Sequence, residues 1–233
     1  QSWTKQSLLR SWRGLRIGTK LGLVVSATLI IVGGIIFFFL DPGDQNVGVH
    51  ISDSFFQSIT ARTAGFNTVS IGALATPAIL FLIFLMFIGG GSGSTAGGIK
   101  TSTFALVFMS AAATIQGKKN VNLYKTQIPW ELMNRAFAIF LFSVVSILLG
   151  VFALSILEPS MNLLDLAFEE VSAFCTVGLS TGITADLGTG SQMILMLSML
   201  VGRVGTLTLA FALSGQRQEV NTFKYPKANI HVG

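Results

Sequence analysis

Three stretches of the chain are almost wholly apolar and about twenty residues long. They are residues 21–40, 136–157 and 193–213, and the last is interrupted only by Arg203. About twenty apolar residues are what an α-helix needs to cross the hydrocarbon core of a bilayer. Charged residues make up only 11% of the chain, against roughly a quarter of an average soluble domain. The pattern predicts an all-α integral membrane protein.

A fourth apolar stretch, residues 74–114, is too long for one membrane span. As a continuous helix it would measure about 60 Å at 1.5 Å per residue, about twice the hydrocarbon thickness. Its middle is GGGSGSTAGG, residues 89–98, and we expect the helix to break there. The alternative is a close-packing surface, since small residues let membrane helices approach, but ten in succession exceed what packing needs.

Two shorter amphipathic stretches, residues 52–61 and 163–174, lie in the connections between these spans. Their length suits a re-entrant helix better than a membrane span. Ser52 with Asp53 and Asn162 are the expected N-caps. Each stretch leads into a loop rich in Thr and Gly, and these loops are TAGFNT (63–68) and TVGLST (176–181).

The two loops are copies of each other, related by one constant shift along the chain. The shift holds without gaps over more than forty residues, and it aligns Phe55 with Phe168, Thr63 with Thr176, Gly65 with Gly178, and Met86 with Met199. The chain is therefore predicted to contain two copies of one unit, in the order helix, re-entrant helix, extended loop, helix.

The charged residues separate by side of the membrane. Twelve of the fifteen Lys and Arg lie before the first span, between the second and third, or after the last, whereas eight of the ten Asp and Glu lie in the other connections. Basic connections favour the cytoplasm, so the net charge of +5 follows from topology. No aromatic–basic surface motif accompanies it, and we expect no nucleic-acid partner. A single cysteine, Cys175, excludes an internal disulfide framework.

Extended backbone at membrane depth needs a special environment. Its carbonyl groups lack partners there unless they are buried in protein or line an aqueous path. The carbonyls of the two loops can replace the hydration shell of a cation, and Gly65 and Gly178 give the backbone freedom to point them one way. Because each helix precedes its loop, its partly negative C-terminal end would favour a cation over an anion.

These residues resemble those of the Trk/Ktr/HKT superfamily of potassium transporters. The two loops, each behind a short helix, are similar to its pore loops. GGGSGSTAGGIKT and VGRVGTLT are similar to the third and fourth repeats of its Ktr-type membrane subunit, from about Arg16 onward. The resemblance implies a potassium-channel-like fold of two tandem helix–pore helix–filter loop–helix repeats, part of a four-repeat pore.

The resemblance also implies selective potassium uptake, commonly stimulated by sodium, with K⁺ as the transported ion and no organic cofactor in this chain. The filter residues would be Thr63, Ala64, Gly65 and Phe66 with Thr176, Val177, Gly178 and Leu179. The gate would be Arg203 with the glycine loop, whose residues are Gly89, Gly90, Gly91, Ser92, Gly93, Ser94, Thr95, Ala96, Gly97 and Gly98.

Several partners are implied in the same way. They are a second membrane subunit in a homodimer, membrane lipid, and a cytosolic RCK/KTN-type ring that would bind ATP/ADP or NAD(H). The bacterial plasma membrane is the expected location. Family members carry four repeats, so the other two loops would come from an N-terminal half absent here, although a pore of two identical halves is an alternative.

The expected division of the chain follows the repeats. A cytoplasmic basic segment (1–20) precedes the first pore repeat (21–116), a cytoplasmic connection (117–135) leads to the second pore repeat (136–215), and a cytoplasmic tail (216–233) ends the chain.

The charged residues near the membrane leave several roles open. Arg203 lies near the middle of its span, where a charge is functional by default; it would act as a barrier, bind glycine-loop carbonyls, or pair with an acid from elsewhere. Arg62 would neutralise the pore-helix end or an acid of a neighbouring loop, and Lys100 would snorkel to the cytoplasmic side. Glu169 and Glu170 would either concentrate cations or serve as caps and inter-loop partners.

Two other classes of function remain open from the sequence. A membrane scaffold would use the re-entrant loops only for packing. A membrane phosphate-handling enzyme would use GGIKT, residues 97–101, although the Lys does not directly follow the Gly as in a phosphate-binding loop. The sequence offers no nucleophile arrangement and no metal-ligand spacing, so we do not expect an enzyme.

Overall fold

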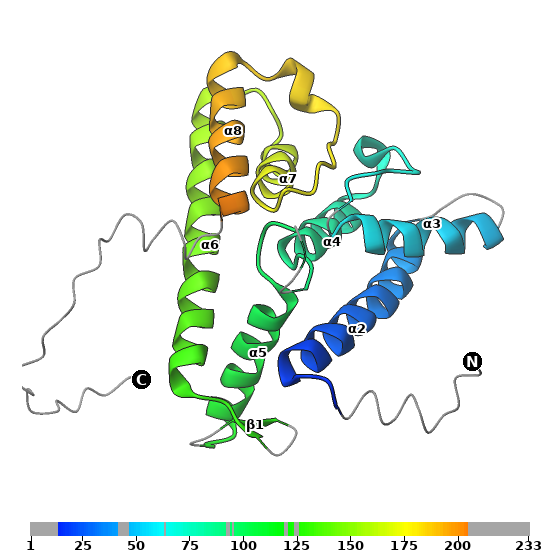
Figure 1. Cartoon of the computed structure of the whole chain (residues 1–233). Coiled ribbons are helices and arrows are strands. Elements are labelled where there is room, and N and C mark those ends of the chain that lie inside the picture. The colour runs from blue at the N-terminus through cyan, green and yellow to red at the C-terminus, as the bar shows by residue number, and fades with distance from the viewer. Residues whose placement is uncertain are drawn as a thin grey trace, which may run out of the picture.

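The computed structural model describes residues 14–41, 47–62, 64–91, 94, 96–118, 121–123 and 126–204. The helices in this part of the chain are α2 (Ile17–Leu40), α3 (Val47–Thr60), α4 (Thr76–Phe87), α5 (Thr101–Ile115), α6 (Trp130–Leu157), α7 (Leu163–Phe174) and α8 (Thr189–Val204), with 3₁₀ turns η1 (Ile71–Ala73) and η2 (Ile183–Asp186). The strands β1 (Asn122–Leu123) and β2 (Thr126–Gln127) form a small antiparallel hairpin (Figure 1).

Helices α2 and α6 are long and apolar enough to cross a membrane. Helix α6 begins at Trp130, ahead of the predicted start at residue 136, because Pro129 precedes it with a φ of −60° and Glu131 lies in its first turn. Both features favour a helix start. The predicted connection 117–135 is therefore shorter than expected, and it contains the β1–β2 hairpin that the sequence pattern did not predict.

The structure confirms the internal repeat. The shift that aligns the two copies in the sequence also places the start of α2, at Ile17, on the start of α6, at Trp130. It likewise places the start of α4, at Thr76, on the start of α8, at Thr189. The short helices α3 and α7 and the turns η1 and η2 fall between them in the same order. The two copies thus share one fold, as the constant shift in the sequence predicted.

The predicted break at the glycine tract is also confirmed. Helix α4 ends at Phe87, and α5 begins at Thr101. Where α4 ends, the equivalent helix α8 continues for several residues more, to Val204. Within the described residues, α8 therefore extends past the position equivalent to the end of α4.

The predicted start of the first short helix was wrong. Helix α3 begins at Val47, so Ser52 and Asp53 lie within it and are not its N-cap. The Ser52 and Ser54 hydroxyls donate to the carbonyls of Gly48 and His50 one turn earlier, which lets serine stay inside a helix. In the second copy the prediction holds: α7 has the predicted bounds, and the Asn162 side chain accepts a hydrogen bond from the Leu164 N–H.

The two copies share one hydrophobic core. It joins Phe37 of α2 and Leu82 and Met86 of α4 to Phe168 and Phe174 of α7. Large apolar side chains also remain exposed, on α6 above all, as expected for surfaces that face lipid or further protein. Figure 1 shows α6 and α8 side by side, with α7 packed against them and α3 crossing the end of α2.

Candidate ion-conduction site

The two repeated loops meet in the structure. Gly65 has a φ of +71° and Gly178 a φ of +92°, a region that L side chains rarely adopt. A Cβ added at Gly65 would overlap the carbonyl oxygen of Val177, and the Gly65 Cα lies 3.8 Å from the position of a Cβ at Gly178. Both glycines are therefore required by their backbone conformation, and Gly65 also by the close approach of the second loop.

The carbonyl groups of the loops fall into two sets. Those of Ala64, Gly65, Val177 and Gly178 accept no hydrogen bond from the residues that the structure describes. The next carbonyl in each loop does: Phe66 accepts from the Thr60 hydroxyl at 2.6 Å, and Leu179 accepts from the Ser172 hydroxyl at 2.6 Å. The first set thus has no hydrogen-bond donor among the described residues, whereas the second is bound by a hydroxyl of the preceding helix.

A cavity of about 460 Å³ adjoins the second loop. Thr176, Val177, Gly178 and Leu179 line one side of it, and Arg203 of α8 also lines it. Arg203 thus shares a cavity with the predicted filter residues of the second copy. It is exposed in this chain.

The glycine tract folds back on itself between α4 and α5. Its two ends are joined where the Gly89 N–H donates to the Ile99 carbonyl at 2.9 Å and the Ile99 N–H donates to the Phe87 carbonyl at 3.3 Å. The Lys100 ammonium donates to the carbonyls of Ser94, at 3.1 Å, and Ala96. Lys100 therefore binds the glycine loop and does not extend away from it, contrary to the snorkelling prediction.

Both ends of the glycine loop contact the filter loops or the residues just before them. The Gly97 N–H donates to the Thr176 hydroxyl at 2.9 Å. At the other end, the Arg62 guanidinium donates to the Gly89 carbonyl at 3.4 Å and to the Ser26 carbonyl of α2 at 3.0 Å. Arg203 is near enough to Lys100 for their charges to repel. The predicted gate residues thus lie directly beside the predicted filter.

The buried acids are explained only by the tertiary structure. Glu169 accepts hydrogen bonds from the Ser180, Thr181 and Thr184 hydroxyls and from the Thr181 N–H, so it stabilises the end of the second loop and the turn that follows it. These contacts join the pore helix to the loop and turn of its own copy, so they are not the pairing between the two loops that the sequence left open. Glu170 is fully buried and accepts a hydrogen bond from the Ser198 hydroxyl of α8 at 2.6 Å.

The structure brings several of the predicted site residues together. Of the filter residues, Gly65 of the first loop lies beside Val177 and Gly178 of the second. Of the glycine loop, Gly89, Gly97 and Gly98 pack against the rest of the site. Four predicted residues fall outside the described part of the chain, and they are Thr63, Ser92, Gly93 and Thr95.

Comparison with known proteins identifies the family. The family model for the TrkH cation transport proteins matches residues 17–222. The chain belongs to the TrkH family. In curated relatives, the match to the Ktr system potassium uptake protein B of Vibrio alginolyticus is 38% identical and covers 96% of this chain and 51% of that protein. The potassium/sodium uptake protein NtpJ of Enterococcus hirae is 33% identical over 94% of this chain and 51% of its own length.

A solved structure of a TrkH-family protein has the same fold. The potassium transporter TrkH from Vibrio parahaemolyticus matches with a TM-score of 0.73 over 83% of this chain and 44% of that one, at 19% sequence identity. The chain thus spans about half the length of the relatives it matches. These relatives are named as transporters.

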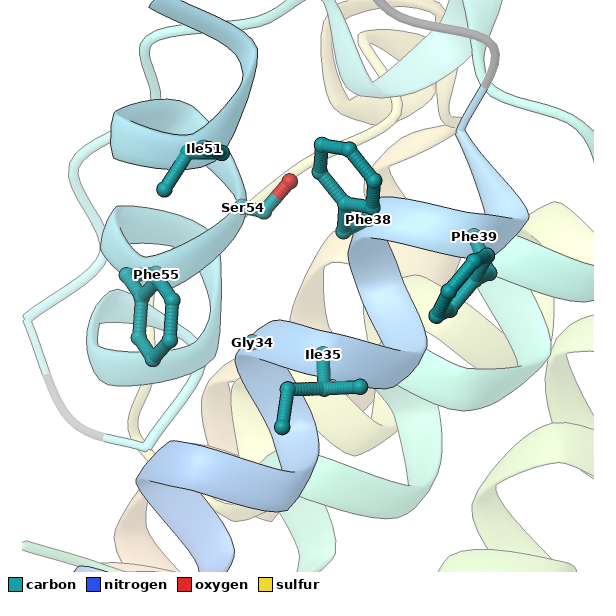
Figure 2. A pocket seen from close by; sticks show the side chains of 7 residues that line it. All are labelled: Gly34, Ile35, Phe38, Phe39, Ile51, Ser54 and Phe55. Carbon is teal, nitrogen blue, oxygen red and sulfur yellow. The ribbon is translucent and has the colours of Figure 1, made fainter. Parts of the chain in front are cut away.

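A second cavity in this TrkH-family chain is apolar and has no oxygen ligands for an ion. It measures about 260 Å³ and lies between α2 and α3. Figure 2 shows Phe38 and Phe39 of α2 and Phe55 of α3 around it, with Ser54 as its one polar side chain. The Ser54 hydroxyl already donates to the His50 carbonyl. A dehydrated cation requires oxygen ligands, so this cavity does not belong to the ion site.

Proposed function

We propose that the chain contributes two filter loops to a channel-like pore for selective potassium uptake. The observation that carries the proposal is the meeting of two repeated loops with left-handed glycines at Gly65 and Gly178. Their neighbouring carbonyls have no hydrogen-bond donor among the described residues. In a membrane, unpaired carbonyls are tolerated where they line an aqueous path, and a ring of them can replace the hydration shell of K⁺.

The short helices support a cation over an anion. Helix α3 ends at Thr60 and α7 ends at Phe174, directly before the two loops. The C-terminal end of a helix carries about half a negative elementary charge. Both helix ends therefore add a favourable potential for a cation at the loops.

Gating would depend on the glycine loop and Arg203. The loop is bound to the start of the second filter loop through Gly97 and Thr176, and Lys100 holds its carbonyls. Arg203 lines the cavity beside the same filter loop. If the glycine loop and the positively charged Arg203 side chain both moved away, the path below the filter would open.

The remaining loops and regulation would come from other parts of the assembly. A pore of four loops requires two more, which an N-terminal half of the protein would supply. The relatives are named as protein B of a Ktr system, which suggests that the system has a further component. We propose that this component is a cytosolic nucleotide-binding ring of RCK/KTN type that binds ATP/ADP or NAD(H). The membrane subunit would be a homodimer in the bacterial plasma membrane.

The proposal is tested by ion uptake into liposomes that contain the complete membrane protein. Rubidium or potassium uptake is measured for the wild type and for Gly178→Ser, with sodium as competitor. We expect selective potassium uptake by the wild type, and sodium entry or loss of flux in the variant, because a side chain at a φ of +92° distorts the loop. A wild type that carries no cation, or a variant that behaves like the wild type, would contradict the filter assignment and favour the scaffold alternative.

A further inference from the structure

We propose that Thr60 and Ser172 determine ion selectivity as positioning residues, by holding the last carbonyl of each filter segment turned towards its own pore helix. The inference rests on the proposed function and adds to it the residues that fix the shape of the filter. Neither residue belongs to the filter segments themselves.

The two hydrogen bonds are short, and the one from Ser172 is buried whereas the one from Thr60 is partly buried. Thr60 Oγ1 donates to the Phe66 carbonyl, and Ser172 Oγ donates to the Leu179 carbonyl, both at 2.6 Å. This is at the short end of the range for O–H···O hydrogen bonds. The side chains are only 2% and 3% exposed. Ser172 Oγ also accepts from the Gly178 N–H at 3.2 Å, so it binds the peptide groups on both sides of the one that joins Gly178 to Leu179.

The two hydroxyls reach equivalent carbonyls from positions that are not equivalent. The shift that aligns the two copies pairs Phe66 with Leu179, whereas it pairs Thr60 with Ala173 and Ser172 with Ile59. The same contact is therefore made twice from different registers of the pore helix. What the two copies share is the fixed carbonyl, not the residue that fixes it.

The physical consequence concerns how many carbonyls face the ion. Carbonyls of Gly65 and Gly178 have no donor in the described residues, whereas those of Phe66 and Leu179 are held by a hydroxyl. Discrimination between K⁺ and Na⁺ depends on the number, field strength and spacing of the coordinating carbonyls. A carbonyl released from its hydroxyl can turn and become an additional ligand. Loss of either hydroxyl should therefore weaken selectivity before it weakens flux.

A purely structural role would have a different result. Removing the donor leaves a buried acceptor unpaired and lowers stability whether or not selectivity is affected. The K⁺/Na⁺ permeability ratio separates the two, because a folded pore with an unchanged filter keeps its ratio. Ser143 of α6 provides the matched control, because it is buried and its hydroxyl donates to the Ile139 carbonyl of its own helix at 2.8 Å and not to a loop carbonyl.

The experiment measures the K⁺/Na⁺ permeability ratio of the complete protein in liposomes for Thr60→Val, Ser172→Ala and Ser143→Ala. We expect the first two to lower the ratio about tenfold, the scale of one lost hydrogen bond, and Ser143→Ala to leave it unchanged. The conservative changes Thr60→Ser and Ser172→Thr keep a hydroxyl and should restore most of the ratio.

The outcomes distinguish the inference from the proposed function. If the wild type carries no cation, the proposed function fails. If the wild type is selective and Thr60→Val and Ser172→Ala keep its ratio, the inference alone is overturned. Where a variant does not accumulate, Thr60→Cys and Ser172→Cys replace it, since a thiol has a similar shape but is a weak donor; a ratio equal to the wild type in these variants also overturns the inference.

Discussion

At the scale of single residues, the site depends on backbone conformations that only glycine accommodates easily. Gly65 combines a positive φ with the close approach of Val177 from the second loop. Gly178 has a positive φ, but a Cβ there would make only an ordinary contact with the Gly65 Cα, at 3.8 Å. The first loop therefore has a steric requirement that the second does not, although the two are copies in the sequence.

Gly65→Ala should abolish potassium uptake and destabilise the protein. A left-handed conformation costs an L residue about 1–2 kcal/mol, and the new Cβ would also overlap the backbone carbonyl of Val177. We expect a lower Tm in detergent and no selective rubidium uptake in liposomes. Gly18→Ala is the control, since a Cβ there meets nothing within 4 Å. A Gly65→Ala protein with wild-type uptake would show that the two loops do not meet in this way.

At the scale of elements, close contacts between helices hold the second copy together. Gly202 of α8 packs directly on the backbone at the end of α7, where a Cβ would overlap the Phe174 carbonyl. Small residues at such positions let membrane helices approach closely. Glu158, just after α6, joins that helix to the start of α8 through the Gly188 N–H at 2.7 Å and the Ser191 hydroxyl at 2.8 Å.

Gly202→Ala should separate α8 from α7. The overlap involves backbone atoms of Phe174, so a side-chain movement cannot relieve it, and we expect a loss of stability of about 2 kcal/mol or more. For a protein of this size, that lowers the Tm by roughly 4–8 °C. In Gly190→Ala the new Cβ makes only an ordinary contact at 3.4 Å with Leu157, and its Tm should stay within about 2 °C of the wild type. Equal Tm values for both variants would contradict the packing.

The link from Glu158 to α8 should depend on pH. Two hydrogen bonds lower the pKa of Glu158 below its ordinary value of 4.5, and the one from the Gly188 N–H has a larger effect than the one from the Ser191 hydroxyl. A lowered pKa means that the stabilisation is complete above about pH 4.5 and is lost as the pH falls through the lowered value. Glu158→Gln removes this dependence, so its Tm should lie below that of the wild type at pH 7 and approach it at pH 3. A Tm difference that stays constant between these pH values would exclude the assignment.

At the scale of the whole molecule, two copies of one unit share a core, and the charge pattern predicts that their connections alternate between the two sides of a membrane. The basic connections are predicted to be cytoplasmic, which places the residues after α5 inside and those after α6 outside. Cys175 is the only cysteine in the chain and is buried. A cysteine introduced at an exposed position of this chain should therefore be the residue that a thiol reagent labels.

Ser160→Cys and Gln116→Cys should react from opposite sides of the membrane. Both side chains are exposed and lie outside the helices, Ser160 after α6 and Gln116 after α5. A membrane-impermeant maleimide added to intact spheroplasts should label Ser160→Cys, and should label Gln116→Cys only after permeabilisation. The unchanged protein should stay unlabelled because Cys175 is 1% exposed. The opposite pattern would reverse the predicted topology.

The sequence by itself determined the architecture. Apolar runs predicted α2 and α6, the glycine tract predicted the break between α4 and α5, and the constant shift between the copies predicted that they share one fold. These features depend on residue type and spacing along the chain: length decides whether a helix can cross a bilayer, and a repeated sequence folds in a repeated way. The start of α3 was mispredicted because serine is favoured at N-caps but is also compatible with a helix interior when it bonds back.

Only the tertiary structure decided which atoms meet. Thr60 and Ser172 do not correspond in the repeat, yet their hydroxyls bind corresponding carbonyls. Arg62 reaches Gly89, 27 residues away, and Gly97 reaches Thr176, 79 residues away. A hydrogen bond depends on distance and angle in space, which the packing of helices sets and local pattern does not contain. The sequence thus determined the elements and their order, and the packing decided which carbonyls remain available to an ion.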